Sequence, residues 1–537
     1  MKSIRLTSMA LTFIGRLALC GAVLITVTTG LYMSHELPQW QGVIWYEHSD
    51  HWHVFNIAKN TLQGGISKSI ESDVYSRLPS FVPDLVIASS LLVTPLKGLW
   101  LQVAYSSIKA LLLYWAGGSI ISDRLRGVGS RCREEEGWII WTIVFCSGAM
   151  LIPGLIFSFV PIHHGGNAVL TIFGLWLAIS SSSSDGRRGI SHVFLLFVLS
   201  LVGVLSNRLF LISWTIPYVV SCLRTCRDSV VHKSVMASAI GSVIGVAIFE
   251  GLRTQGRDSV DIRGIYAALV NSLSLQGVVV SIVMIGVGVG LWKPVSDWLS
   301  RGRLKSVGVI TGFGLVCYLL SLIASIIVSE GRVEVRYMLP ATWVVLILLA
   351  LWLSIIIQSA KTEYVRWVGL GVVAAIVVGQ LGYGSGVTQW QFALSERTNT
   401  VLKLLGKEQL SHQHGLAAYP AWQASALYWL SNGEFPLLEA SSDSNPLFWH
   451  RWKGAYLREG VATSKGISSV SKNDVLDIHY VLVDSQSQRV EKRYGLPDKE
   501  VCIVEDASAC IWIYDDSTGI RINTATFINT YGDRVKS

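Results

Sequence analysis

The run SVGVITGFGLVCYLLSLIASIIV occupies positions 306–328 and follows the basic stretch RGRLK at 301–305. It carries no charged residue, and as a helix it would extend about 35 Å at 1.5 Å per residue. That length crosses the ~30 Å hydrocarbon core of a bilayer, where every backbone polar group needs a partner inside the segment. The run therefore predicts a transmembrane helix, and the basic residues before it predict a cytoplasmic start.

Ten further runs are apolar over comparable lengths, and we predict a membrane-spanning helix for each. They lie at 12–33, 99–121, 137–160, 166–183, 190–206, 209–223, 234–250, 274–292, 339–358 and 367–386. The composition agrees, since 51% of the 537 residues are hydrophobic and only 15% are charged, with a mean hydropathy of +0.47. The predicted fold class is an all-α polytopic membrane domain of about 11 transmembrane helices, followed by an α+β domain.

Basic residues report the orientation of these spans. With the N-terminus in the cytoplasm, every short loop assigned to the inside is basic, as at 124–133, 187–188, 224–233, 293–305 and 361–366. The odd number of spans then places the C-terminal part on the outer face of the membrane, which in a bacterial inner membrane is the periplasmic face. The formal net charge of +8 is mostly this topology signal, and we predict no nucleic-acid partner.

The chain divides into two predicted domains. A transmembrane domain covers 1–388 and includes a large first periplasmic loop at 34–98, and a soluble periplasmic domain covers 389–537. The second domain mixes helical patterns at 395–407 and 421–431 with short β-branched runs, which indicates an α+β fold. Those runs lie at 478–484, 501–504 and 510–514.

Two cysteines of the C-terminal domain, Cys502 and Cys510, flank a predicted strand–turn–strand centred on Asp506. In such a hairpin the two thiols lie opposite each other, close enough for a disulfide in an oxidising compartment. Two buried thiols in a small core are the alternative.

Two charged residues interrupt the apolar pattern near the first loop. The segment 80–96 is apolar but short, and Pro83, Asp84 and Pro95 break it. We predict a juxtamembrane or re-entrant segment on the outer face that does not cross the membrane. Lys109 lies inside a predicted span, and we expect its side chain to extend towards the interface.

The first loop carries WYEHSDHWHVFNIAKNTLQGG at 45–65. Its apolar positions after Asp50 fit one face of an amphipathic helix that we expect to lie on the membrane and to end at Gly64-Gly65. These positions are Trp52, Phe55, Ile57, Ala58 and Leu62. Asp50 can cap this helix, or it can accept a proton from a substrate hydroxyl at the membrane surface, and the two roles are compatible.

This loop resembles that of polytopic glycosyltransferases of the GT-C fold class, among them bacterial mannosyl- and arabinosyltransferases that use polyprenyl-phosphate sugars. In that class an acidic motif leads into a helix with a recurring set of residues. The chain keeps Asp50, then Ala58, Asn60, Leu62 and Gly64-Gly65 in the same order. It departs at His51, where many members carry Glu. The resemblance covers mainly residues 12–130.

The resemblance implies an enzyme. A membrane glycosyltransferase would transfer a sugar from a polyprenyl-phosphate or polyprenyl-diphosphate donor to a glycan or glycolipid acceptor of the envelope, on the periplasmic side of the bilayer. The candidate catalytic residues are Asp50, as general base, and Glu47.

Later outer-face motifs supply candidate substrate-binding residues. PIHHGGN at 161–167 contains His163 and His164, and SNRLF at 206–210 contains Arg208. Arg336 and Tyr337 precede the tenth span and resemble an R-Y-x-x-P element of the same class. A guanidinium at this boundary suits a lipid phosphate because it offers several donors in a fixed fork. Snorkelling at the interface is the alternative.

His51 and His53 complete the candidate substrate-binding set. Together with the other histidines and the acidic motif they admit a divalent cation, although their spacing is not that of a closed zinc site. Otherwise they hydrogen-bond substrate hydroxyls. The metal ligands are unknown, and we assign no certain cofactor.

Aromatic residues are frequent in the C-terminal domain, at Tyr419, Trp422, Tyr428, Trp429, Trp449 and Trp452. Their faces can stack on sugar rings, and a core or membrane-interface role is equally compatible with the sequence.

Two other functions compete with the glycosyltransferase. An O-antigen polymerase or ligase usually has its large outer loop between late spans, whereas the large outer segments here are the first loop and the C-terminal part. A non-enzymatic transporter or flippase for lipid-linked glycans predicts paired charges within the spans and repeated halves. The sequence shows neither pattern.

Overall fold

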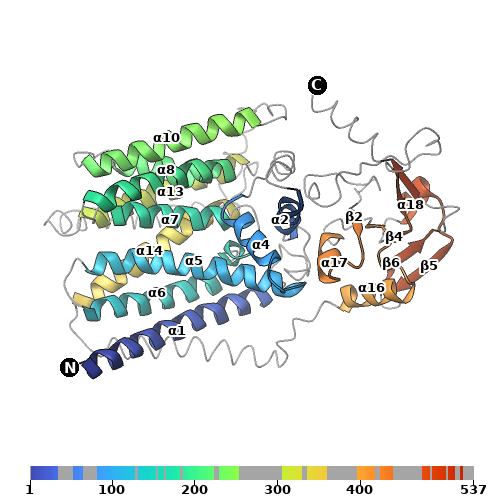
Figure 1. Cartoon of the computed structure of the whole chain (residues 1–537), viewed down its shortest axis with the longest axis horizontal. Coiled ribbons are helices and arrows are strands. Elements are labelled where there is room, and N and C mark those ends of the chain that lie inside the picture. Colours follow the sequence, from blue (N-terminus) through green and yellow to red (C-terminus); the bar gives the residue numbers. More distant parts are fainter. Residues whose placement is uncertain are drawn as a thin grey trace.

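The computed structural model describes residues 2–33, 52–64, 81–126, 131–152, 155–161, 165–181, 186–222, 229–252, 305–328, 335–359, 396–417, 424–439, 475–483, 487–503, 506–514 and 520–523. Within these residues the chain is mostly helical, and a small sheet lies near its C-terminus. Figure 1 shows long helices running side by side, with the strands gathered beyond one end of them.

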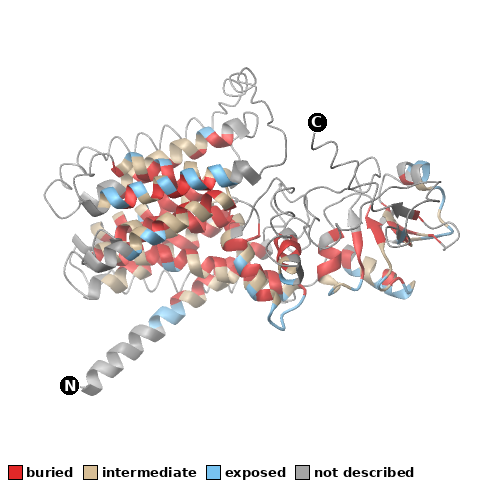
Figure 2. Ribbon diagram, turned by 45° about the horizontal axis from the view of Figure 1, so that its top comes forward, coloured by how far each residue is buried: buried red, intermediate tan, exposed pale blue. Residues whose placement is uncertain are grey.

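The long helices form what we call the helical bundle. They are α1 (Lys2–Met33), α5 (Leu99–Arg126), α6 (Arg131–Leu151), α7 (Gly165–Ser181), α8 (Gly186–Ser206), α10 (Ser229–Leu252), α13 (Lys305–Val328) and α14 (Val335–Ser359). Helix α5 contacts α1, α6 and α7, and α14 contacts α6, α7 and α13, while α8 packs between α7 and α10. Residues that are buried lie mainly along the inward parts of these helices (Figure 2).

Short helical segments connect the long helices. They are η5 (Phe81–Leu85), α4 (Val86–Leu92), η6 (Leu155–Ser158), η7 (Leu211–Thr215) and α9 (Ile216–Cys222). The run 80–96 thus forms η5 and α4, which would extend only about 18 Å if they were collinear, too little to cross a bilayer. The predicted non-crossing segment agrees with this length.

Two of the described helices are long and apolar enough to cross a membrane, judged by length and composition. These stretches are Val231–Ile248 in α10 and Tyr337–Ile355 in α14. Other apolar helical stretches are shorter, at Gly15–Leu31, Val82–Leu92, Gly165–Ser180, Ser191–Ser206, Leu211–Cys222 and Ile310–Ser325. The predicted spans 274–292 and 367–386 lie outside the described residues, so the total of eleven stays a prediction.

Hydroxyl side chains join the helices within the bundle. The indole Nε1 of Trp214 donates to Ser200 Oγ at 3.1 Å and to Ser238 Oγ at 2.9 Å, which ties η7 to α8 and α10. Thr215 and Ser242 share a hydrogen bond of 2.7 Å, which also joins η7 to α10. Such bonds orient helices in an apolar interior, where hydrophobic packing alone is less directional.

The C-terminal part combines a sheet with helices, as predicted. Its helices are α16 (Glu396–Lys407), α17 (Ala424–Leu430) and α18 (Ser487–Tyr494). Its strands are β1 (Gly415–Ala417), β2 (Leu437–Glu439), β3 (Val475–Ile478), β4 (Tyr480–Val483), β5 (Lys499–Ile503), β6 (Asp506–Ile513) and β7 (Ile520–Asn523). Five strands form one sheet in the order β2-β1-β4-β6-β5, and β3 pairs with β7. The domain boundary at 388–389 lies outside the described residues.

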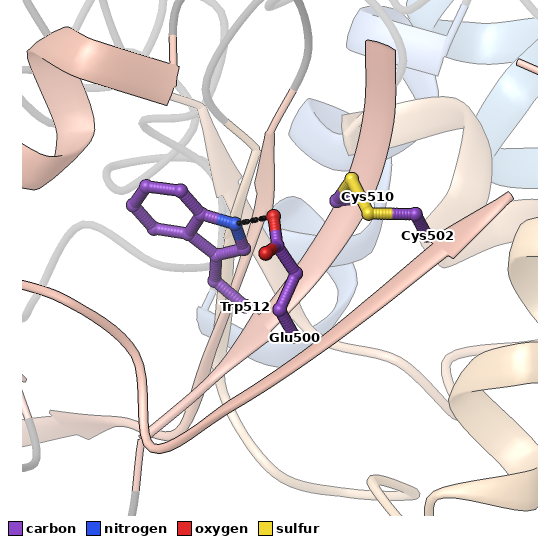
Figure 3. The surroundings of a disulfide bond; sticks show 4 residues. All are labelled: Glu500, Cys502, Cys510 and Trp512. Atoms are coloured by element: carbon purple, nitrogen blue, oxygen red, sulfur yellow. Dashed lines mark hydrogen bonds between the residues drawn. A yellow bond between two sulfur atoms is a disulfide. The ribbon is translucent and has the colours of Figure 1, made fainter. Parts of the chain in front are cut away.

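The β5–β6 pairing confirms the two predicted strands, although Asp506 is the first residue of β6 and residues 504–505 between the strands lie outside the described residues. Cys502 and Cys510 are register partners and form a disulfide, shown in Figure 3. Glu500 and the two cysteines bring three potential metal-ligand atoms within 4.8 Å of one another. The sulfurs are bonded to each other, however, and the Glu500 carboxylate accepts a hydrogen bond from Trp512 Nε1 at 2.7 Å. This group is therefore a cross-strand link and a poor metal site.

We expect peptide mapping without reduction to recover Cys502 and Cys510 as one linked pair. The chain-entropy model assigns about 2–3 kcal/mol to closing so short a loop, so Cys502→Ser/Cys510→Ser should increase amide exchange in β5 and β6. The internal controls are Cys20, Cys146 and Cys317, which form no disulfide in the structure and should alkylate after denaturation without reduction. Alkylation of Cys502 or Cys510 under the same conditions would contradict the link.

Candidate functional site

Several predicted site residues have no described position. Glu47, Asp50, His51, His163 and His164 lie outside the described residues. The backbones of His53 and Arg336 are described at the starts of α2 (His53–Gly64) and α14, and the side chains of Arg208 and Tyr337 are described as well.

Those described positions lie near one end of the bundle, which we call the η5 end. It contains η5, η6, the start of α7 and the end of α8. The Val82 amide in η5 donates to Ser206 Oγ at 3.0 Å, and Arg208 follows two residues later with an exposed side chain. Trp343 Nε1 in α14 donates to Ser158 Oγ of η6 at 2.8 Å. Tyr337 precedes Trp343 by about 9 Å of helix and is half-buried.

A buried ion pair forms the centre of the η5 end. Lys109 Nζ lies 3.1 Å from Asp84 Oδ1, and the two side chains are 0% and 4% exposed. The Tyr105 hydroxyl donates to the same oxygen at 2.5 Å, and Lys109 Nζ also donates to the Val160 carbonyl at 3.1 Å. Lys109 therefore does not extend to the interface but pairs with Asp84 of the non-crossing segment η5.

The sequence carries a signal for this ion pair that the predictions above did not include. Asp84 and Lys109 each interrupt an apolar run, and opposite charges in neighbouring apolar runs find each other because an isolated charge there is costly. Tertiary packing brings the two elements that carry these charges together.

Gly165 and Gly166 make room for the pair at the start of α7. A Cβ atom on Gly166 would lie 2.7 Å from Asp84 Oδ2. A Cβ on Gly165 would lie 2.6 Å from the Ser158 carbonyl oxygen and 2.7 Å from Lys109 Nζ. A side chain is excluded at both positions, so the carboxylate reaches the first turn of α7, where the positive end of the helix dipole stabilises it.

Helix α2 also lies at the η5 end, between the bundle and α17 (Figure 1). The predicted helix and its end at Gly64 are confirmed. Its apolar face packs against α4, α5 and α17, with Trp52, Phe55 and Ala58 fully buried and Leu62 exposed. The expected surface-lying helix is thus corrected to one enclosed by protein, because amphipathic spacing does not distinguish lipid from a protein neighbour.

Aromatic contacts connect α2 to the buried pair on one side and to α17 on the other. The ring centroids of Phe55 and Tyr105 are 5.7 Å apart, and Tyr105 donates to Asp84. The rings of Trp52 and Trp429 are stacked at 5.8 Å. Tyr428 and Trp429 are therefore core residues of this contact, while Tyr419, Trp422, Trp449 and Trp452 lie outside the described residues.

The chemistry of the described cluster is that of a structural anchor. Asp84 is almost fully buried and is held by a hydroxyl and an ammonium group, so it is poorly placed to take a proton from a substrate. The pair instead fixes η5 and α5 against α7, next to the connections that carry the predicted histidines and Arg208.

The chain matches none of the protein-family models with which it was compared, and no curated protein sequence shows a significant match to it.

We expect Asp84→Asn to destabilise the protein by about 3–5 kcal/mol, because it leaves the Lys109 ammonium buried without its counter-charge. The double variant Asp84→Leu/Lys109→Met removes both charges and should recover most of that loss. Thermal unfolding in detergent would measure both effects.

A matched control is Glu134→Gln, which breaks the more exposed pair that Glu134 forms with Arg16, also at 3.1 Å. This change should cost at most about 1 kcal/mol. Equal losses for Asp84→Asn and Glu134→Gln, or a double variant as unstable as the single one, would show that the buried pair is not an anchor.

Proposed function

We propose that the chain is an integral membrane glycosyltransferase of GT-C type in a bacterial inner membrane. It transfers a sugar from a polyprenyl-phosphate or polyprenyl-diphosphate donor to an envelope glycan or glycolipid acceptor on the periplasmic side. The observation that carries the proposal is the packing of α2, the helix that directly follows Asp50, at the junction of the bundle and the C-terminal part. Clefts at such junctions are common sites for ligands.

In the proposed reaction the acceptor oxygen attacks the anomeric carbon of the donor sugar. The bond from that carbon to the phosphate oxygen breaks, and the polyprenyl phosphate leaves with the electron pair. Asp50, three residues after the second candidate acid Glu47, takes the proton of the acceptor hydroxyl. Arg336 and Arg208 stabilise the charge that develops on the phosphate. His51, His53, His163, His164 and Tyr337 are proposed to bind the two substrates.

The location in a membrane is supported by the outer faces of the bundle. Large apolar side chains are exposed there, including Phe194 on α8, Val243 on α10 and Trp115 on α5. Apolar surface of this extent is compatible with lipid contact. A periplasmic position for the C-terminal part is supported by its disulfide, because such bonds persist in oxidising compartments.

One observation favours a transporter of lipid-linked glycans as the second candidate. The Asp84–Lys109 pair is a buried pair of charges within the bundle, which transport proteins frequently use. Its partners are a tyrosine and a peptide carbonyl on adjacent elements, which is equally suited to a static anchor.

We expect Asp50→Asn to lower sugar transfer by about 10²–10⁴-fold, because the amide cannot accept the hydroxyl proton. The assay would use the full chain in nanodiscs with a panel of polyprenyl-phosphate hexoses and pentoses, and would follow sugar transfer to isolated envelope glycolipid. The control is Asp477→Asn, an exposed acid in β3 that should leave transfer unchanged.

Full transfer by the Asp50→Asn protein would reject the mechanism. Movement of labelled glycolipid across proteoliposomes without any transfer product from the wild type would instead favour the transporter.

A further inference from the structure

The helix that follows Asp50 is held by a segment far away in the chain, since Trp429 and Asn56 are 373 residues apart. Trp429 in α17 stacks on Trp52 with an interplanar angle of 8°, and its ring lies 6.0 Å from that of Phe55. Trp52 and Phe55 are fully buried by this contact and by α4 and α5. The C-terminal part thus closes one side of α2.

A directional bond fixes the register of this contact. Trp429 Nε1 donates to Asn56 Oδ1 at 2.7 Å, and Asn56 is fully buried. An apolar stack tolerates sliding of one ring over the other, whereas a buried hydrogen bond does not, because separating its groups leaves them unsatisfied. The bond therefore sets the position of α2 along α17.

Lys59 provides a second attachment one turn further along α2. Its ammonium group donates a hydrogen bond to the Tyr428 hydroxyl. The same group lies 4.9 Å from the centroid of the Tyr428 ring and 5.8 Å from that of the Trp429 ring. Asn56 and Lys59 are three residues apart and share a face of the helix. Two attachments on one face restrict rotation of α2 about its own axis.

We propose that Trp429 is a positioning residue. Through it the C-terminal part sets the position of α2 and therefore of Asp50, which precedes this helix. The inference rests on the proposed function. Asp50 precedes the stacked Trp52 by two residues, so the two Cα atoms are at most about 7 Å apart, and the position of α2 bounds where the proposed base can lie. Misplacement of a catalytic group by about 1 Å can lower a rate 10²-fold.

The test compares three substitutions in the full chain. Trp429→Ala removes the stack and the N–H donor, and Trp429→Phe keeps a ring and removes the donor. The matched control is Trp512→Phe, since Trp512 lies in β6, packs in the core of the sheet and donates its own Nε1–H to Glu500 at 2.7 Å.

We expect Trp429→Ala to lower kcat about 10²-fold and Trp429→Phe about 10-fold, with the KM for the donor within about 3-fold of the wild type. Trp512→Phe should leave both constants near the wild-type values. In a double-mutant cycle, Trp429→Phe/Asn56→Leu should lose no more than Trp429→Phe alone, because both changes break the same bond.

Amide hydrogen exchange supplies a readout that does not depend on the reaction. Exchange over residues 53–64 should rise in both Trp429 variants, while exchange in α5 and α7 stays at the wild-type level. If Trp429→Ala fails to fold, then Trp429→Phe carries the test.

The outcomes separate the two proposals. Unchanged exchange in α2 overturns the inference, and so does increased exchange with unchanged kcat. A rise in α2 exchange in a protein whose wild type transfers no sugar supports the docking of α2 and rejects the glycosyltransferase proposal.

Discussion

The interaction on which the η5 end depends is the buried pair between Asp84 and Lys109. Neither charge is stable alone in this interior, so η5 and α5 must pack together for either residue to be accommodated. The pair also sets the start of α7, since Lys109 binds the Val160 carbonyl and only glycine fits at 165 and 166. The ion pair therefore holds together the elements next to the connections that carry candidate substrate-binding residues.

Helix α2 extends this arrangement towards the C-terminal part. Tyr105 contacts Asp84 through its hydroxyl and Phe55 through its ring, and Trp429 packs against Phe55 and Trp52 on the same apolar face. The bundle and the C-terminal part thus share one helix, which neither buries completely alone. A loop helix packed between two parts of the protein is held more rigidly than one that lies on a membrane surface.

The sheet of the C-terminal part has its own core and its own cross-link. Trp512 packs with Val481 and Val490, and the disulfide closes the hairpin at the edge of the sheet. The contact with α2 is made instead by α17, at the side of the sheet formed by β1 and β2. The sheet therefore supports α17, the element through which the C-terminal part contacts α2.

The sequence by itself determined where most elements lie. Apolar length and charge bounded the helix at 306–328, found as Lys305–Val328, and strand periodicity around Asp506 paired Cys502 with Cys510. It also identified the apolar face of α2, but not what covers it, because lipid and protein impose the same helical spacing. Only the tertiary structure decided that Trp429 covers Trp52 and that Lys109 meets Asp84. No local pattern joins Trp52 to Trp429, and one charge in each of two neighbouring apolar runs indicates a pair without giving its geometry. The energy of a buried charge or a buried indole N–H depends on the partner that folding brings to it.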